Sequence, residues 1–177
     1  MNLPDNEQFV IVYADPPWNY RDRMLKHGGA ERHYPTMTTK QIAALPVADI
    51  VAKDAFLFLW ATFPNLPAAL EIMKAWNFTY KTAAFTWIKT NPISASPCFG
   101  AGHYTRANAE VCLLGVRGRP TVVSHSVQSA IIHPRGRHSQ KPDEARDRIV
   151  QLCGDVPRIE LFARTRADGW TSWGNEI

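Results

Sequence analysis

The sequence predicts an α/β protein with a mainly parallel β-sheet that is covered by helices on both faces. Apolar runs at 9–14, 55–60 and 110–116 are rich in β-branched and aromatic residues and have the length of buried strands. Segments 66–76 and 142–153 alternate with such runs and carry helix signals. This alternation along one chain is typical of a parallel sheet with helices packed on both sides.

The first strand, 9–14, is an unbroken apolar run. The polar, Gly- and Arg-containing stretch 19–37 is predicted to be a long mobile loop. Thr38 and Gln41 have the spacing of a capping box, which predicts a short helix from there to about residue 45. Pro46 ends that helix.

The second strand, 55–60, leads into the helix 66–76. Asn65 is predicted to cap this helix, and Pro67 fits its first turn because the N–H that proline lacks has no partner there. The apolar residues of the helix recur at helical spacing and predict a buried stripe of Leu70, Met73 and Trp76.

A third strand is predicted at 79–88, and a loop of Asn, Pro, Ser and Gly follows at 90–103. The fourth strand is 110–116. Residues 117–140 are expected to be irregular, with a short apolar piece at 130–132.

The third long helix starts at Pro142, with Asp143 and Glu144 near its N-terminus, where acidic side chains are favourable. Gly154 ends it. The last predicted strand is 158–163. Because ligands of such sheets bind beyond the carboxyl ends of the strands, residues that follow the first and last strands are expected to share one crevice.

Composition and length bound the class of protein. With 177 residues, no linker and no repeat, the chain is expected to be a single domain, 1–177. It has no membrane-length apolar run and no signal-peptide pattern, so we expect a cytoplasmic protein that does not contact membranes. Cysteines and histidines lack ligand spacing, which predicts reduced cysteines and no metal site.

The net charge of +4 fits a polyanionic partner. Basic residues gather in loops, where each group has the alternative of being an ordinary solvated surface. Near a pocket for a base they become candidate phosphate contacts. These groups are Arg117 with Arg119; Arg135 with Arg137, His138 and Lys141; and Arg21, Arg23, Lys26 and Arg32.

The most informative segment is Asp15-Pro16-Pro17-Trp18, which follows the first strand. Asp15 accepts hydrogen bonds, Pro16 offers a carbonyl without an N–H, and the prolines hold the backbone rigid. Trp18 supplies a flat face on which a base can stack. Together these groups suit an exocyclic amine on an aromatic ring, such as adenine N6. The plain alternative is a stiffened turn with a core tryptophan.

Asp15-Pro16-Pro17-Trp18 is also the hallmark of the MT-A70 family of S-adenosylmethionine-dependent adenine N6-methyltransferases. The resemblance spans nearly the whole chain, because further blocks occur in the family's order. It implies a Rossmann-like methyltransferase fold with a permuted motif order, in which the amine-binding strand comes first and the cofactor segment last. The further blocks are 34–37, 57–62, 87–90, 110–118, 138–144, 159–164 and 169–176.

The resemblance implies direct methyl transfer from S-adenosylmethionine to adenine N6. Asp15 and the Pro16 carbonyl would accept the two N–H bonds of the amine, Pro17 would hold the turn, and Trp18 would stack on the base. Stacking contributes roughly 1–3 kcal/mol per base. Lys141 would pair with the cofactor's carboxylate. The other residues assigned to cofactor binding are Tyr13, Ala14, Asp15, Glu160, Arg164, Asn175 and Glu176, of which Glu160 has a structural role as its alternative.

Loops 19–36 and 90–108 resemble the family's gates around the target base. Glu110 is a candidate contact near the base, with a core network as its alternative. The full set assigned to nucleic acid is Arg21, Arg23, Tyr34, His103, Tyr104, Arg106, Asn108, Glu110, Arg135, Arg137 and His138. Trp60, Trp76 and Trp87 are assigned to the core.

The chain resembles the compact prokaryotic and phage members of the family, so DNA is the favoured acceptor. An RNA adenine N6-methyltransferase, and a non-catalytic nucleic-acid-binding partner in a methyltransferase complex, are the alternatives. Because so short a chain has little room for reading sequence, recognition is expected to be short or loose, or shared with a second subunit. A homodimer or a second subunit is the expected partner.

Overall fold

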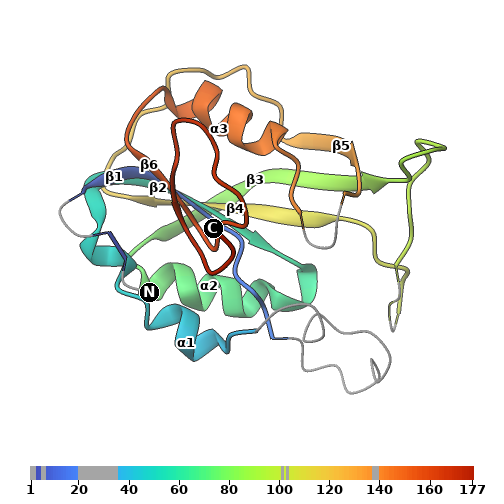
Figure 1. Cartoon of the computed structure of the whole chain (residues 1–177), viewed down its shortest axis with the longest axis horizontal. Helices are drawn as coiled ribbons and strands as arrows, with labels where there is room; N and C mark the ends of the chain where they lie inside the picture. Colours follow the sequence, from blue (N-terminus) through green and yellow to red (C-terminus); the bar gives the residue numbers. More distant parts are fainter. Residues whose placement is uncertain (1–2, 5–6, 20–35, 101, 103, 137–139) are drawn as a thin grey trace.

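A computed structural model describes residues 3–4, 7–19, 36–100, 102, 104–136 and 140–177. Within these residues the chain forms one seven-stranded sheet of order β5-β3-β4-β2-β1-β6-β7 (Figure 1). The strands are β1 (Phe9–Ala14), β2 (Val51–Ala61), β3 (Thr79–Thr90), β4 (Glu110–Arg117), β5 (Ala130–Pro134), β6 (Arg158–Leu161) and β7 (Thr171–Trp173). The helices are α1 (Thr39–Ala43), α2 (Leu66–Ala75) and α3 (Glu144–Cys153), with 3₁₀ turns η2 (Val47–Asp49) and η3 (Phe63–Asn65).

The sheet is mixed rather than purely parallel. β1 pairs in parallel with β2 and β6, β6 with β7, and β3 with β5. β4 is antiparallel to both of its neighbours, β2 and β3. β3 and β4 are joined by a loop without a crossover helix, and such a connection places successive strands in opposite directions. The expected mainly parallel sheet is therefore confirmed, with β4 as the exception.

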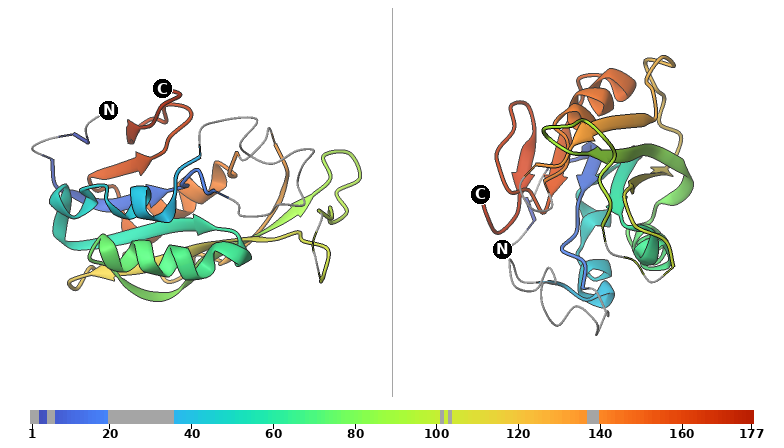
Figure 2. Two further views of the ribbon diagram at one scale, coloured as in Figure 1. Left: turned by 90° about the horizontal axis from the view of Figure 1, so that it is seen from below. Right: turned by 90° about the vertical axis from the view of Figure 1, so that its right-hand side faces the viewer.

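Helices cover both faces of the sheet, as predicted. α1 and α2 pack on one face and α3 on the other (Figures 1 and 2). β1 shows how one strand serves both layers, because Val12 and Ala14 belong to the α1/α2 side while Ile11 and Tyr13 belong to the α3 side. We call these two layers the α1/α2 face and the α3 face.

Two details of α2 differ from the prediction. Its buried residues are Ala69, Ile72 and Met73, followed by Trp76, whereas Leu70 is 43% exposed. The predicted stripe was therefore placed on the wrong side at Leu70. Asn65 occupies the N-cap position, as predicted, but its side chain makes no capping hydrogen bond, because its Nδ2 donates to Thr62 Oγ1 at 3.1 Å.

Two edge strands were not predicted. Segment 130–134 was expected to be irregular, yet it forms β5 by pairing with β3, and 171–173 forms β7 beside β6. Both are short and sit at the sheet edges. The capping box of α1 is confirmed, and so is the burial of Trp60, Trp76 and Trp87. Most of the predicted loop 19–37 lies outside the described residues.

None of the helices in the described ranges has the length and apolarity needed to cross a bilayer. All three cysteines, Cys98, Cys112 and Cys153, are unbridged, as expected.

Candidate active site

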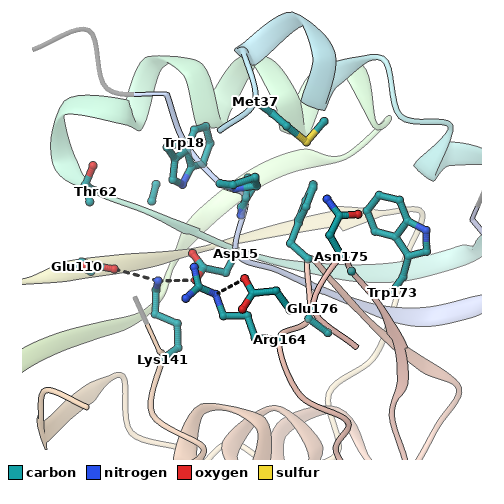
Figure 3. A pocket seen from close by; sticks show the side chains of 16 residues that line it. Asp15, Trp18, Met37, Thr62, Glu110, Lys141, Arg164, Trp173, Asn175 and Glu176 are labelled. Carbon is teal, nitrogen blue, oxygen red and sulfur yellow. Dashed lines mark hydrogen bonds and ion pairs between the residues drawn. The ribbon is translucent and has the colours of Figure 1, made fainter. Parts of the chain in front are cut away.

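A cavity of about 490 Å³ opens where β1 and β6 end and β4 begins (Figure 3). Most of its lining comes from two parts of the chain that are far apart in sequence. One part is the segment Asp15–Trp18 after β1, and the other is the C-terminal segment from Phe162 to Glu176 around β7. The residues that follow β1 and β6 therefore share one crevice, as predicted.

The turn after β1 divides its side chains between the two faces of the sheet. Asp15 lies on the side from which Lys141 approaches, while Trp18 belongs to the apolar core of the α1/α2 face (Figure 3). The Trp18 indole is nearly buried, and its Nε1 donates to the Trp60 carbonyl at 3.2 Å. An immobilised ring at the cavity wall suits stacking, because it loses little further freedom when a base binds.

The backbone of this turn is fixed by hydrogen bonds. The Trp18 N–H donates to the Pro16 carbonyl at 2.8 Å, and Met37 N–H donates to the Pro17 carbonyl at 2.9 Å. A carbonyl oxygen has two lone pairs, so the Pro16 oxygen retains the capacity for a second donor. Met37 also lines the cavity, and the sequence had not singled it out as a site residue.

Asp15 is held by a lysine. Lys141 Nζ lies 2.6 Å from Asp15 Oδ2 and 3.2 Å from Glu110 Oε2. Glu110 in turn accepts from Lys89 Nζ at 2.5 Å through its other oxygen, Oε1. The four side chains form a row of alternating charges that ends at Asp15.

This row sets the protonation of its members. Burial raises the pKa of Asp15, and the nearby Lys141 ammonium opposes this shift. Burial acts in the same direction on Glu110, but the two lysines outweigh it and its pKa lies below the ordinary value. Although burial lowers the pKa of Lys141, Asp15 and Glu110 more than compensate, so it is raised. Lys141 is therefore a permanent cation at neutral pH.

The opposite wall carries three of the residues assigned to cofactor binding. Arg164, Asn175 and Glu176 all line the cavity, and Arg164 Nε lies 3.6 Å from Glu176 Oε1. Lys141 lines the cavity as well, so the structure brings it together with these three and with Asp15. That Lys141 pairs with a cofactor carboxylate remains a prediction, since here its ammonium faces Asp15 and Glu110.

Further residues of this wall were missed. Phe162 lies in the left-handed region (φ 63°), and its ring meets Trp173 edge to face at 5.5 Å. A side chain at Gly174 would collide with the backbone of Ala163, so only glycine allows this close approach. The recurrence of Gly and Trp in 169–174 was a usable signal for such packing.

Three residues assigned to the cofactor do not line the cavity. Tyr13 and Ala14 are buried inside the sheet, and the Tyr13 hydroxyl accepts from Trp60 Nε1 at 2.8 Å. Glu160 binds Arg146 through both oxygens, at 2.7 and 3.0 Å. The alternative of a structural role for Glu160 is therefore supported by its ion pair with Arg146. The cofactor roles of these three residues stay predictions.

The residues assigned to nucleic acid are spread over several surroundings. Tyr104, Arg106 and Arg135 are exposed, whereas Glu110 lies in the cavity. Asn108 uses its side-chain amide on the backbone, accepting from Lys89 N–H and donating to the carbonyls of Lys89 and Cys98. Outside the described residues lie Arg21, Arg23, Tyr34, His103, Arg137 and His138.

Comparison with known proteins decides the family. The MT-A70 model matches residues 9–176. The chain belongs to the MT-A70 family. It is 34% identical to the Type II methyltransferase M.MunI of Mycoplasma sp, covering 97% of this chain and 78% of that protein. It is 30% identical to the N(6)-adenosine-methyltransferase catalytic subunit METTL3 of Homo sapiens and to its Danio rerio counterpart, covering 96% of this chain but only 28% of each of them.

Membership of the MT-A70 family confirms what the resemblance implied about the class of protein. It is an enzyme with a Rossmann-like fold, it transfers methyl groups, and S-adenosylmethionine is its methyl donor. The cavity fits that donor chemically, because acidic, basic and amide side chains meet aromatic ones on one wall. In the described part of the chain, no group of three or more His, Cys, Asp and Glu is placed to hold a metal ion.

Proposed function

We propose that this MT-A70 protein transfers the methyl group of S-adenosylmethionine to N6 of adenine in DNA. The observation that carries the proposal is the shared cavity, in which Asp15 and Pro16 face Arg164, Asn175 and Glu176. An acceptor for an exocyclic amine and a polar wall for a nucleoside-like donor are thereby brought into one cavity.

The bound donor supplies an electrophilic methyl carbon on a sulfonium. Asp15 and the Pro16 carbonyl accept the two N–H bonds of the adenine amine, which directs the nitrogen lone pair away from the ring and toward the methyl carbon. The new N–C bond forms as the S–C bond breaks, and the positive charge passes to the amine. Asp15 then accepts the proton that the methylated amine loses.

Lys141 makes the two oxygens of Asp15 inequivalent. Its ammonium donates to Oδ2, and we assign Oδ1 to the amine. Burial raises the pKa of Asp15, and the same ammonium opposes this shift and so favours the carboxylate form that accepts from the amine. Trp18 stacks on the base and fixes its plane.

DNA is preferred as the acceptor because of how the relatives align. The chain spans most of M.MunI but about a quarter of the METTL3 proteins. Its net charge of +4 suits a nucleic acid of either kind. RNA adenine is therefore the second arm of the test. Action as a single domain, location in the cytoplasm, and a homodimer or second subunit remain predictions from the sequence.

The test is transfer of labelled methyl from S-adenosylmethionine to matched DNA, RNA and nucleoside acceptors. Asp15→Asn is expected to lower kcat at least about 100-fold, because misplacing the amine alone has an effect of that size. The matched control is Asp49→Asn, an exposed acid at the opposite end of the sheet. Equal labelling by both variants would overturn the mechanism, and stronger labelling of RNA than of DNA would overturn the choice of acceptor.

A further inference from the structure

The row of charges that ends at Asp15 begins at a residue with no assigned role. Lys89 is near the end of β3, Glu110 starts β4, Lys141 precedes α3 and Asp15 follows β1. Four separate segments of the chain thus contribute one member each. Figure 3 shows the inner part of the row, with Glu110 and Asp15 on either side of the Lys141 ammonium.

Lys89 is held more firmly than an ordinary surface lysine. Its ammonium lies 5.1 Å from the centre of the Trp87 ring, which attracts cations. Asn108 accepts from its backbone N–H at 3.0 Å and donates to its carbonyl at 2.8 Å. The side chain is only about one-quarter exposed. Since the residue is already ordered, its ion pair with Glu110 loses little side-chain entropy.

The division of oxygens on Glu110 gives Lys89 a specific effect. Lys89 occupies Oε1 and Lys141 contacts Oε2. Lys141 is shared between Glu110, at 3.2 Å, and Asp15, at 2.6 Å. If Lys89 were neutral, the whole charge of Glu110 would compete with Asp15 for the Lys141 ammonium.

We infer that Lys89 is a positioning residue for methyl transfer: by neutralising Glu110 it keeps Lys141 on Asp15. The inference rests on the proposed function, because it assumes that Asp15 accepts the amine proton. It adds a residue that touches neither the cavity nor the reacting atoms, and it predicts a change in how the catalytic acid titrates.

The direction of that change follows from the charges around Asp15. Lys141 and Arg164 lower the Asp15 pKa, and Glu110 raises it. Removing Lys89 leaves the effect of Glu110 uncompensated, so the Asp15 pKa rises and its carboxylate is protonated over a wider range of pH. Asp15 also interacts electrostatically with three other titratable groups, which are Tyr13 in β1, Cys112 in β4 and Glu160 in β6.

The experiment compares Lys89→Met with Lys81→Met, an exposed lysine on the same strand. For Lys89→Met we expect the acidic limb of the kcat profile to move up by about one pH unit, which is about a tenfold loss of kcat on that limb. Lys81→Met and Lys89→Arg should follow the wild type. A Lys89→Met limb that overlaps the wild-type limb would overturn the inference.

A double variant separates charge from fold. In Lys89→Met/Glu110→Gln both outer charges are gone, so the acidic limb is expected to return to within about 0.3 pH units of the wild type, less than a third of the shift of the single variant. A limb that stays shifted in the double variant would show a structural role only. Urea unfolding of each variant checks that the compared proteins are folded.

The carboxyl titration itself makes the test independent of turnover. ¹³C NMR of the Asp15 side chain in the wild type and in Lys89→Met should show the same upward shift without any acceptor present. If wild-type protein methylated no acceptor while this shift was seen, the proposed function would fail and the placement of Lys89 would stand. If the Asp15 titration were unchanged while methylation was normal, the inference about Lys89 would fail and the proposed function would stand.

Discussion

The two faces of the sheet differ in the chemical character of their side chains. The α1/α2 face is an apolar core in which Ile42, Ile72 and Met73 pack together, and its buried indoles of Trp18 and Trp76 donate to backbone carbonyls. The α3 face carries buried charges and side-chain hydrogen bonds. Its polar side chains include Tyr13, Trp60, Lys141, Arg146 and Glu160.

This difference separates folding from chemistry. Apolar contacts are not directional, so the α1/α2 face contributes stability without constraining any charge. Buried ion pairs contribute little net stability but are costly to break, because the remaining charge has no partner. The α3 face therefore links the position of a charge, and through it the reaction, to the intact fold.

The largest expected effect comes from breaking the Arg146–Glu160 pair on the α3 face. Arg146→Met leaves the Glu160 carboxylate buried and unpaired, which is expected to lower the free energy of unfolding by about 3–5 kcal/mol at pH 7. Loss of the guanidinium raises the Glu160 pKa beyond the rise that burial already causes. A group with a raised folded pKa favours the folded state as the pH falls, so part of the loss should be recovered at pH 5.

Urea unfolding at the two pH values checks this expectation. The matched control is Arg146→Met/Glu160→Gln, which removes both charges and should recover much of the stability. A single variant as stable as the wild type at pH 7 would mean that the two faces do not differ in this way.

The next largest effect is expected from a substitution in the apolar core of the α1/α2 face. Ile72→Ala empties a fully buried position on α2 and should lower the free energy of unfolding by about 2–5 kcal/mol. Methyl transfer per folded molecule should not change, because Ile72 belongs to the apolar cluster of the α1/α2 face and does not line the cavity. Leu70→Ala, two residues away and partly exposed, is the control and should stay within about 0.5 kcal/mol. A change in kcat with Ile72→Ala at full folding would contradict the separation.

The smallest effect is the pH dependence of stability at Glu110. Its pKa is lowered in the folded protein, so its contribution to stability is present above the unfolded value of about 4.3 and is lost as the pH falls through the folded value. The difference in unfolding free energy between wild type and Glu110→Gln should therefore narrow between pH 7 and pH 3. Glu71→Gln, on the exposed side of α2, serves as the control. A difference that is constant with pH would show that Glu110 is not linked to folding through its charge.

Much of the fold was accessible from the sequence because its signals are local. The apolar runs of β1 and β2, the capping box at Thr38 and the glycine at 154 each act within a few residues. β5 and β7 were missed because they are short and exist only through pairing with β3 and β6. Leu70 was misplaced because a helix with small residues at several positions has two plausible apolar stripes.

The site also has residues that the sequence reveals and contacts that only the fold reveals. Asp15 and Trp18 were found from their chemistry, and Arg164 and Asn175 from family blocks, and all four line the cavity. The contact between Lys141 and Asp15 joins residues 126 positions apart, which no local pattern encodes. Lys89 stood inside a family block, yet only its distance to Glu110 gives it a role.

The Asn108 side chain bears on which sequence changes this enzyme can tolerate. Its amide ties the backbone of Lys89 and Cys98 together at the base of the segment 91–107. Insertions, deletions or altered residues beyond that tie leave the spacing between Lys89 and Glu110 intact. Changes of sequence in the outer segment are therefore compatible with an unchanged Lys89–Glu110 ion pair.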